Sequence, residues 1–382
     1  MNVAMLPSLD AHGRLAAPRS ATPLTTGTNL HTAIPKRSSS PHAIPFQGAS
    51  GPNRYVSRAH ARPRGSPGRR TAAAVWGAGG GGSRRLQDDP LLNDLAEFVL
   101  ETAESIAIET GEIIRKRIKQ IKTVERKEYA CDLVTEVDKE CERYISNVVQ
   151  STFPLHRIIG EETATEADMA WLQQGASPAA ADADNGAAGA STAMNEWAWI
   201  VDPIDGTLNF VGEIPMCAVS LGVARHGRME VGVVYNPFAN ELFSCRRGEG
   251  AYLNGSRIAI PNVPTAIGDA AIAVGFPSNP SQRQRMVEAV AAVAPHARTM
   301  RAFGSAALHM SYVAAGRLGA FFEEGLKPWD VAAAHLLVEE AGGVVTSMTG
   351  EPLLLRGGSV LATSGGQQLH SHILSLIGKE EV

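Results

Sequence analysis

Residues 197–210 read WAWIVDPIDGTLNF, and this stretch decides the fold. Its apolar opening predicts a buried β-strand, and Pro203 and Gly206 predict that the strand stops at Asp202 and Asp205. Two aspartates at a strand end, where backbone carbonyls are also free, form a cluster of oxygen ligands for a hard cation such as Mg²⁺. We therefore expect a metal site at the end of this strand.

The residues that follow the aspartates extend this hypothesis to an anion. Thr207 places a hydroxyl beside the expected metal, and the chain from Gly206 onward could open a helix whose free N–H groups bind a phosphate oxygen. The alternative is that Asp-Pro-Ile-Asp-Gly forms only a turn, because Asp, Pro and Gly are the commonest turn residues. Acidic groups elsewhere in the chain bear on this choice.

Charge is unevenly distributed along the 382 residues. Residues 1–85 hold twelve Lys and Arg against one acid, which leaves 23 basic and 38 acidic residues in 86–382. We expect such an acidic body to bind no nucleic acid and to hold an anionic substrate through bound metal. No apolar run reaches the ~18 residues of a membrane span, and the four cysteines lack zinc-site spacing, which predicts reduced thiols.

Composition also predicts the domain organisation. Residues 1–85, rich in Arg, Ser, Pro, Ala and Gly, are expected to be a disordered organelle transit peptide and linker, for plastid or mitochondrion. A plain basic tail, a mistranslated 5′ sequence and a cytoplasmic location remain alternatives. Residues 86–265 are expected to form an α+β part with the metal site, in which 163–195 is a mobile low-complexity insertion. Residues 266–382 are expected to form a smaller α/β part.

The pattern of elements predicts a layered α+β fold. A long amphipathic helix begins near Asp88-Asp89-Pro90, and a second helix follows Asp138. The three segments Met216–Arg225, Met229–Asn236 and Glu241–Arg246 alternate with turn signals, which indicates an antiparallel meander. From about Ile272 strands and helices alternate, which indicates a second, α/β layer.

Three further acidic motifs have local explanations when taken singly. Asp138 follows Thr135 in a helix-capping pattern, and Asp330 at a helix start could be an N-cap. Glu161 and Glu162 follow a short strand and could lie on a solvated loop. The case for a shared site therefore depends on all of them together.

Together these motifs resemble the inositol monophosphatase family, in the family's order and over about residues 90–378. The resemblance implies alternating layers in the order α-β-α-β-α, a Mg²⁺-dependent and often lithium-sensitive phosphomonoesterase, and a homodimer. The stretches that carry it are Asp132-Leu-Val-Thr-Glu-Val-Asp138, Gly160-Glu161-Glu162, Asp202-Pro-Ile-Asp205-Gly-Thr207-Leu-Asn209-Phe210, Trp329-Asp330-Val-Ala-Ala and Glu340-Ala-Gly-Gly.

The resemblance also implies roles for single residues. Two or three Mg²⁺ ions would be held by Glu161, Asp202, the carbonyl of Ile204, Asp205 and Asp330. Thr207 and Glu161 would orient the attacking water, with Asp138 supporting Thr207 and with Lys127 also at the site. Gly206 and Thr207 would bind phosphate, and substrate contacts would come from Asp205, Gly304, Ser305, Ala306, Glu323 and Asp330.

The expected reaction is hydrolysis of inositol monophosphate to inositol and phosphate by metal-activated water, with activity falling at low pH because the ligand acids must be ionised. The chain departs from the family at Ala334, which should not disturb a helix, and near Gly212 and Glu213. The changes near Gly212 and Glu213, with the insertion at 163–195, leave the preferred ester open. Alternatives are phosphatases of histidinol phosphate, fructose-1,6-bisphosphate or 3′-phosphoadenosine phosphate. A different class is a non-catalytic regulator that binds metal or a partner protein.

Overall fold

The structure is a computed structural model, and it describes residues 90–120, 122–127, 133–175, 197–260 and 266–378 of the chain. The predictions for residues 1–85 and for the helix start at Asp88-Asp89 lie outside the described residues. Every described residue belongs to one compact unit. The predicted division between residues 265 and 266 stays a prediction, because it falls beside the undescribed residues 261–265.

A seven-stranded sheet contains the stretch on which the sequence analysis began, and its strands run in the order β3-β4-β5-β6-β7-β8-β9. β3 is parallel to β4, and the remaining neighbours are antiparallel, which confirms the predicted meander. The strands are β3 (Arg157–Gly160), β4 (Trp197–Asp205), β5 (Ala218–Arg225), β6 (Arg228–Asn236), β7 (Glu241–Arg246), β8 (Gly250–Leu253) and β9 (Ser256–Ile258).

The central strand β4 passes through Pro203, where the sequence analysis expected a turn. It continues through Pro203 to Asp205 and is buried along its whole length. The register against β5 shifts between Asp202 and Asp205, so Pro203 sits in an irregular segment of the ladder. A bulge tolerates a residue without an N–H donor, which is why Pro203 does not end the strand.

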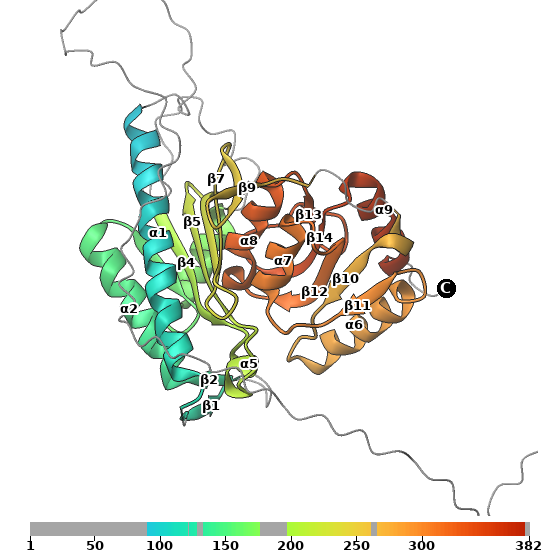
Figure 1. Ribbon diagram of the computed structural model, residues 1–382, viewed down its shortest axis with the longest axis horizontal. Coiled ribbons are helices and arrows are strands. Elements are labelled where there is room, and N and C mark those ends of the chain that lie inside the picture. Colours follow the sequence, from blue (N-terminus) through green and yellow to red (C-terminus); the bar gives the residue numbers. More distant parts are fainter. Residues whose placement is uncertain (1–89, 121, 128–132, 176–196, 261–265, 379–382) are drawn as a thin grey trace, which may run out of the picture. The chain divides into compact units, whose positions relative to one another are not determined.

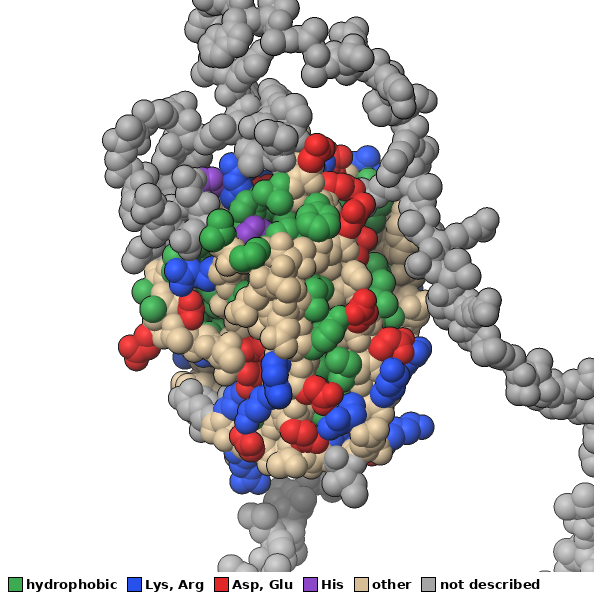
Figure 2. Space-filling model, turned by 90° about the vertical axis from the view of Figure 1, so that its left-hand side faces the viewer, with side chains coloured by type: hydrophobic (Ala, Val, Ile, Leu, Met, Phe, Trp, Pro, Cys, Tyr) green, Lys and Arg blue, Asp and Glu red, His purple; other side chains and the backbone are tan. Residues whose placement is uncertain are grey.

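Two helices cover one face of this sheet, namely α1 (Pro90–Arg117) and α2 (Glu136–Thr152) (Figure 1). Val99, Ala103 and Ile106 recur at helical spacing on α1 and are fully or almost fully buried in one cluster with side chains of β4, β5 and β6. Burying one such aliphatic side chain stabilises the fold by about 1.5–3 kcal/mol. Figure 2 views the side on which these helices lie, where acidic, basic and hydrophobic side chains are interspersed.

The other face of the sheet is covered by α7 (Ala306–Ala314) and α8 (Pro328–Glu340). A Cβ atom on Gly232 of β6 would lie 2.4 Å from the carbonyl oxygen of Ala333, so α8 can lie this close only against glycine. The hydroxyl of Ser220 on β5 also donates to the carbonyl of Trp329, at 3.2 Å. This close packing brings the start of α8 to the sheet.

A second sheet lies beyond α7 and α8, with the strand order β11-β10-β12-β14-β13 (Figure 1). Its outer face is covered by α6 (Pro280–Val293) and α9 (Gly366–Ile377). This arrangement confirms the predicted α+β fold with α-β-α-β-α layers. The strands are β10 (Ala271–Val274), β11 (Thr299–Arg301), β12 (Ala320–Leu326), β13 (Val344–Thr346) and β14 (Gly358–Thr363).

The predicted insertion at 163–195 needs a correction in its first part. Helix α3 (Glu166–Gly175) lies within it, and Trp171 and Leu172 of this helix are 8% and 1% exposed in the core between the layers. Two large apolar side chains interrupt the polar composition there and anchor the helix. Residues 176–195 lie outside the described residues. The remaining short elements are β1 (Val124–Arg126), β2 (Leu133–Thr135), α5 (Thr207–Val211) and the 3₁₀ turn Ile267–Asp269.

Candidate active site

The parallel pairing of β3 with β4 brings Glu161 to the central aspartates. Gly160 pairs with Val201, and the N–H of Glu161 donates to the Val201 carbonyl at 3.0 Å. Glu161 therefore lies beside Asp202, the next residue of β4. Asp202 is 2% exposed, and its carboxylate accepts a hydrogen bond from the N–H of Ile204 at 3.0 Å.

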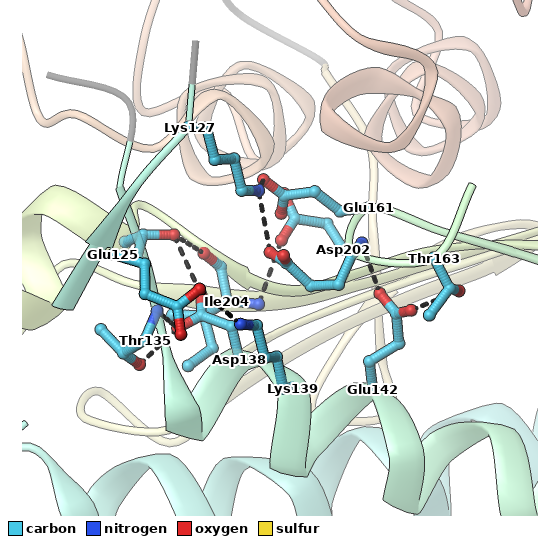
Figure 3. A network of polar contacts seen from close by, with 12 residues as sticks. Glu125, Lys127, Thr135, Asp138, Lys139, Glu142, Glu161, Thr163, Asp202 and Ile204 are labelled. Carbon is cyan, nitrogen blue, oxygen red and sulfur yellow. Dashed lines mark hydrogen bonds and ion pairs between the residues drawn. The ribbon is translucent and has the colours of Figure 1, made fainter. Parts of the chain in front are cut away.

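Lys127 lies at this same point, just after β1. Its ammonium donates to Glu161 at 2.7 Å and to Glu162 at 2.8 Å, and Figure 3 shows it above Asp202. Burial by itself would lower the pKa of Lys127, but the two glutamates outweigh burial and raise it. Lys127 is therefore a fixed positive charge in the site.

Asp205 joins the end of β4 to the start of α7. Its carboxylate accepts hydrogen bonds from the hydroxyl of Ser305 and from the N–H groups of Ala306 at 3.3 Å and Ala307 at 2.9 Å. These N–H groups lie in the first turn of a helix, where donors lack partners within the helix. The predicted substrate contacts Ser305 and Ala306 thus meet Asp205, a hundred residues earlier in the chain.

Gly206 follows with a backbone conformation that favours glycine. Its φ is 92°, and a Cβ atom there would lie 3.0 Å from the carbonyl oxygens of Gly304 and Met216. Asn209 bridges the same two segments, because its side-chain amide donates to the carbonyls of Phe303 at 2.6 Å and Met216 at 2.9 Å. The tight turn after β4 therefore holds the chain segment that precedes α7.

Thr207 and Asp138 meet at the other side of this turn. The Thr207 hydroxyl lies 3.1 Å from both Asp138 and the Ile204 carbonyl oxygen. Asp138 is completely buried and also accepts from the N–H and hydroxyl of Thr135, so it caps α2 as well as contacting Thr207. Burial raises the pKa of Asp138 to about 6, against the effect of these hydrogen bonds.

Asp330 reaches the site from the start of α8, but it is not the N-cap that the sequence suggested. Lys327 is the N-cap, and the Asp330 carboxylate accepts a hydrogen bond from its N–H at 2.7 Å. Asp330 is thus the third residue of the helix, where the second half of a capping box lies. Ser220, which binds the Trp329 carbonyl, pairs with Asp202 across the sheet, so Asp330 approaches the central aspartates.

Glu323 of β12 completes the acidic group. Its carboxylate lies against Gly275, where a Cβ atom would be only 1.8 Å from a glutamate oxygen. Burial raises its pKa well above the ordinary value, and the charges of Asp330 and Asp205 raise it further. Glu323 therefore faces the same carboxylates from the second sheet.

The electrostatics of this group favour a bound cation. Burial raises the pKa of Asp202 well above its ordinary value, and the charges of Glu161 and Asp205 add to this effect. Burial likewise raises the pKa of Asp330 well above its ordinary value, that of Glu161 to about 7 and that of Asp205 to about 6. Buried carboxylates that repel one another are the oxygen-rich donor set of a hard divalent cation.

Some of the carboxylates that could bind the metal are occupied by other partners in this structure. Within the described ranges, no group of three or more His, Cys, Asp or Glu side chains is already arranged to hold a metal ion. Lys127 engages Glu161, and α7 engages Asp205, which accounts for two of the carboxylates. The set fits Mg²⁺ in its chemistry, provided that these side chains reorient.

The structure brings every predicted site residue to this region and adds two that the sequence analysis did not assign. Asn209 and Glu142 both lie behind the site, and Glu142 contacts the loop that carries Glu161. The periodicity of α2 could have indicated Glu142, since it lies four residues after Asp138 and so on the same face of the helix.

Comparison with known proteins agrees with the geometry. A model of the inositol monophosphatase family matches residues 95–381. Inositol monophosphatase 3 of Solanum lycopersicum is 37% identical over 277 residues, 71% of this chain and 94% of its own length. The Nus factor SuhB of Escherichia coli is 36% identical over 270 residues, 69% of this chain and 90% of its own length. The crystal structure of the extragenic suppressor protein suhB from Bartonella henselae superposes with a TM-score of 0.63 at 29% identity, covering 74% of this chain and 99% of that one.

Proposed function

Because the chain belongs to the inositol monophosphatase family, we propose that it is a Mg²⁺-dependent phosphomonoesterase that hydrolyses inositol monophosphate to inositol and inorganic phosphate. The family match supports phosphatase activity. The observation that carries the proposal further is the group of buried carboxylates around Asp202, whose mutual repulsion a divalent cation would relieve. A polyol phosphate is the substrate class that such relatives suggest.

The metal ligands that we propose are the carboxylates of Glu161, Asp202, Asp205 and Asp330 with the carbonyl of Ile204. Two or three Mg²⁺ ions held there would activate water, polarise the phosphate and neutralise the leaving oxygen. Asp202 is suited to the centre of the set, because its pKa responds to three other members.

Thr207 is proposed to orient the attacking water. Asp138 and the Ile204 carbonyl hold its hydroxyl in place, so the hydroxyl oxygen can accept a hydrogen bond from water while its own proton stays engaged. Glu161 would orient that water together with Thr207, and Lys127 would hold the Glu161 carboxylate in place. No covalent nucleophile is then needed.

We propose that the substrate binds between the turn after β4 and the segment that precedes α7. The N–H groups of Gly206 and Thr207 would contact phosphate. The segment Gly304-Ser305-Ala306 and the carboxylates of Glu323 and Asp205 would contact the hydroxyls of the sugar alcohol. Asp330 would serve both metal and substrate.

The test is phosphate release by the full chain from inositol-1-phosphate, histidinol phosphate, fructose-1,6-bisphosphate and 3′-phosphoadenosine-5′-phosphate. We expect Mg²⁺-dependent release led by the inositol ester, abolished by EDTA and reduced by lithium. A faster rate on another ester would move the assignment to that substrate. If the folded protein binds metal but hydrolyses none of these esters, the proposed phosphatase activity is refuted.

A second candidate is a regulator that acts by binding a partner, because the relative from E. coli is named a Nus factor. Asp205→Asn separates the two functions. It should remove turnover in a phosphatase, whereas binding of a partner at another surface would persist.

Location and assembly are also proposals. The basic, acid-poor residues 1–85 support targeting to a plastid or mitochondrion, with a cytoplasmic protein as the alternative. A homodimer follows from the resemblance to the family. Among the described residues no helix is both long and apolar enough to cross a membrane.

A further inference from the structure

Glu142 of α2 is a buried carboxylate that the proposed mechanism does not use. It is 2% exposed, and it lies one helical turn beyond Asp138, which contacts Thr207. Both acids point from the same face of α2 toward the site, as Figure 3 shows. Burial of a carboxylate is costly unless its oxygens find partners, so the partners of Glu142 indicate why it is there.

The two oxygens of Glu142 bind two successive residues of the loop after β3. One accepts the N–H of Glu162 at 2.9 Å, and the other accepts the hydroxyl of Thr163 at 2.6 Å. Both donors are neutral, and no cation forms an ion pair with Glu142 within the described part of the chain. Glu142 thus acts as an acceptor for the loop.

Gly160 shows how closely the carboxylate fits under this loop. A Cβ atom on Gly160 would lie 2.3 Å from the Glu142 carboxylate carbon and 2.5 Å from each of its oxygens. The φ of Gly160 is not positive, so the glycine is needed for space and not for its backbone conformation. The Glu142 carboxylate therefore packs directly against Gly160, where a larger side chain would not fit.

The loop is also held from its other side. Lys127 binds the side chains of Glu161 and Glu162, while Glu142 binds the backbone below them. The N–H of Glu161 is tied to Val201 of β4. Three attachments from different elements therefore hold this loop beside Asp202.

We propose that Glu142 is a positioning residue: by binding the N–H of Glu162 and the hydroxyl of Thr163 it sets where the loop presents the Glu161 carboxylate to the metal. This inference rests on the proposed function, in which Glu161 is a metal ligand. Outer partners of ligands typically change metal affinity or activity 10–100-fold when removed.

The experiment measures binding of Mn²⁺, a paramagnetic stand-in for Mg²⁺, to the full chain by electron paramagnetic resonance. Glu142→Ala should weaken Mn²⁺ binding by about 10–100-fold. Glu142→Gln should retain most of the affinity, because its oxygen can still accept the Glu162 N–H and its amide can donate to the Thr163 hydroxyl. Thr163→Val removes one of the two attachments at an exposed residue and should weaken binding less than Glu142→Ala does.

The matched control is Glu140→Gln on the same helix, where Glu140 pairs with Arg117 at 2.8 Å away from the loop. It should bind Mn²⁺ as the natural protein does. Equal losses in Glu142→Gln and Glu142→Ala would overturn positioning in favour of a charge effect. Unchanged binding in Thr163→Val and in folded Glu142→Ala would also overturn it.

The Mn²⁺ measurement separates this inference from the proposed function. If no ester is hydrolysed but Mn²⁺ binding falls in Glu142→Ala, the positioning role holds without the phosphatase. If inositol-1-phosphate is hydrolysed and Glu142→Ala binds Mn²⁺ normally, the positioning role alone is refuted.

Discussion

Replacing Asn209 by alanine tests whether the turn after β4 holds the segment before α7. The Asn209 amide donates to the carbonyls of Phe303 and Met216, and alanine would leave both carbonyls without these donors. At about 1 kcal/mol for each hydrogen bond, the free energy of unfolding should fall by about 2 kcal/mol. Asn209→Asp should cost more, since a carboxylate would face two carbonyl oxygens.

Asn209→Ala should also reduce catalysis, because Ser305 follows this segment and donates a hydrogen bond to Asp205. A shift of the segment misplaces Asp205, so kcat/KM should fall roughly tenfold or more. The assays are urea unfolding and steady-state phosphate release. Leu208→Ala is the control, because Leu208 is 58% exposed and should change stability by less than about 0.5 kcal/mol. An unfolding free energy for Asn209→Ala as close to the natural protein as this control would refute the reasoning.

Three further predictions concern metal, pH and stability. Asp205→Asn should reduce turnover more than about 100-fold, because it removes a proposed ligand; phosphate release would show it, and near-normal rates would contradict the site. Since burial raises the pKa of Glu161 to about 7, protons should compete with metal, and the Mg²⁺ concentration for half-maximal rate should be higher at pH 6 than at pH 8. Burial lowers the pKa of His309 to about 3. Below about pH 6.5 His309 therefore binds a proton in the unfolded chain but not in the folded chain. Unfolding measurements should show the stability advantage over His309→Gln shrinking by about 2 kcal/mol from pH 7 to pH 5, and a constant difference would refute a neutral buried His309.

Local sequence patterns predicted much of the fold correctly. The helical spacing of apolar residues indicated α1 and α2, and turn residues between β-prone runs indicated the meander of β5, β6 and β7. These patterns are readable because a helix or strand buries one face with a fixed period. The acidic motifs were visible for a similar reason, since each lies at the end of an element.

Other features depended on contacts between residues distant in sequence. β4 runs through Pro203 because a bulge against β5 absorbs it, and Asp330 is the third helical residue because Lys327 caps α8. Trp171 anchors a helix inside a segment whose average composition suggested mobility. Average composition hides single buried residues such as Trp171. Local motifs do not specify how one strand is aligned with the next.

The sequence by itself therefore determined which elements form and which acids stand at their ends, because periodicity and turn chemistry act over a few residues. Only the tertiary structure decided how those ends meet. Asp205 accepts hydrogen bonds from N–H groups in the first turn of α7, about a hundred residues later in the chain. Glu142 packs under the loop that carries Glu161 because Gly160 has no side chain there. Register between strands and the depth of helix packing set these contacts, and both arise from the whole core.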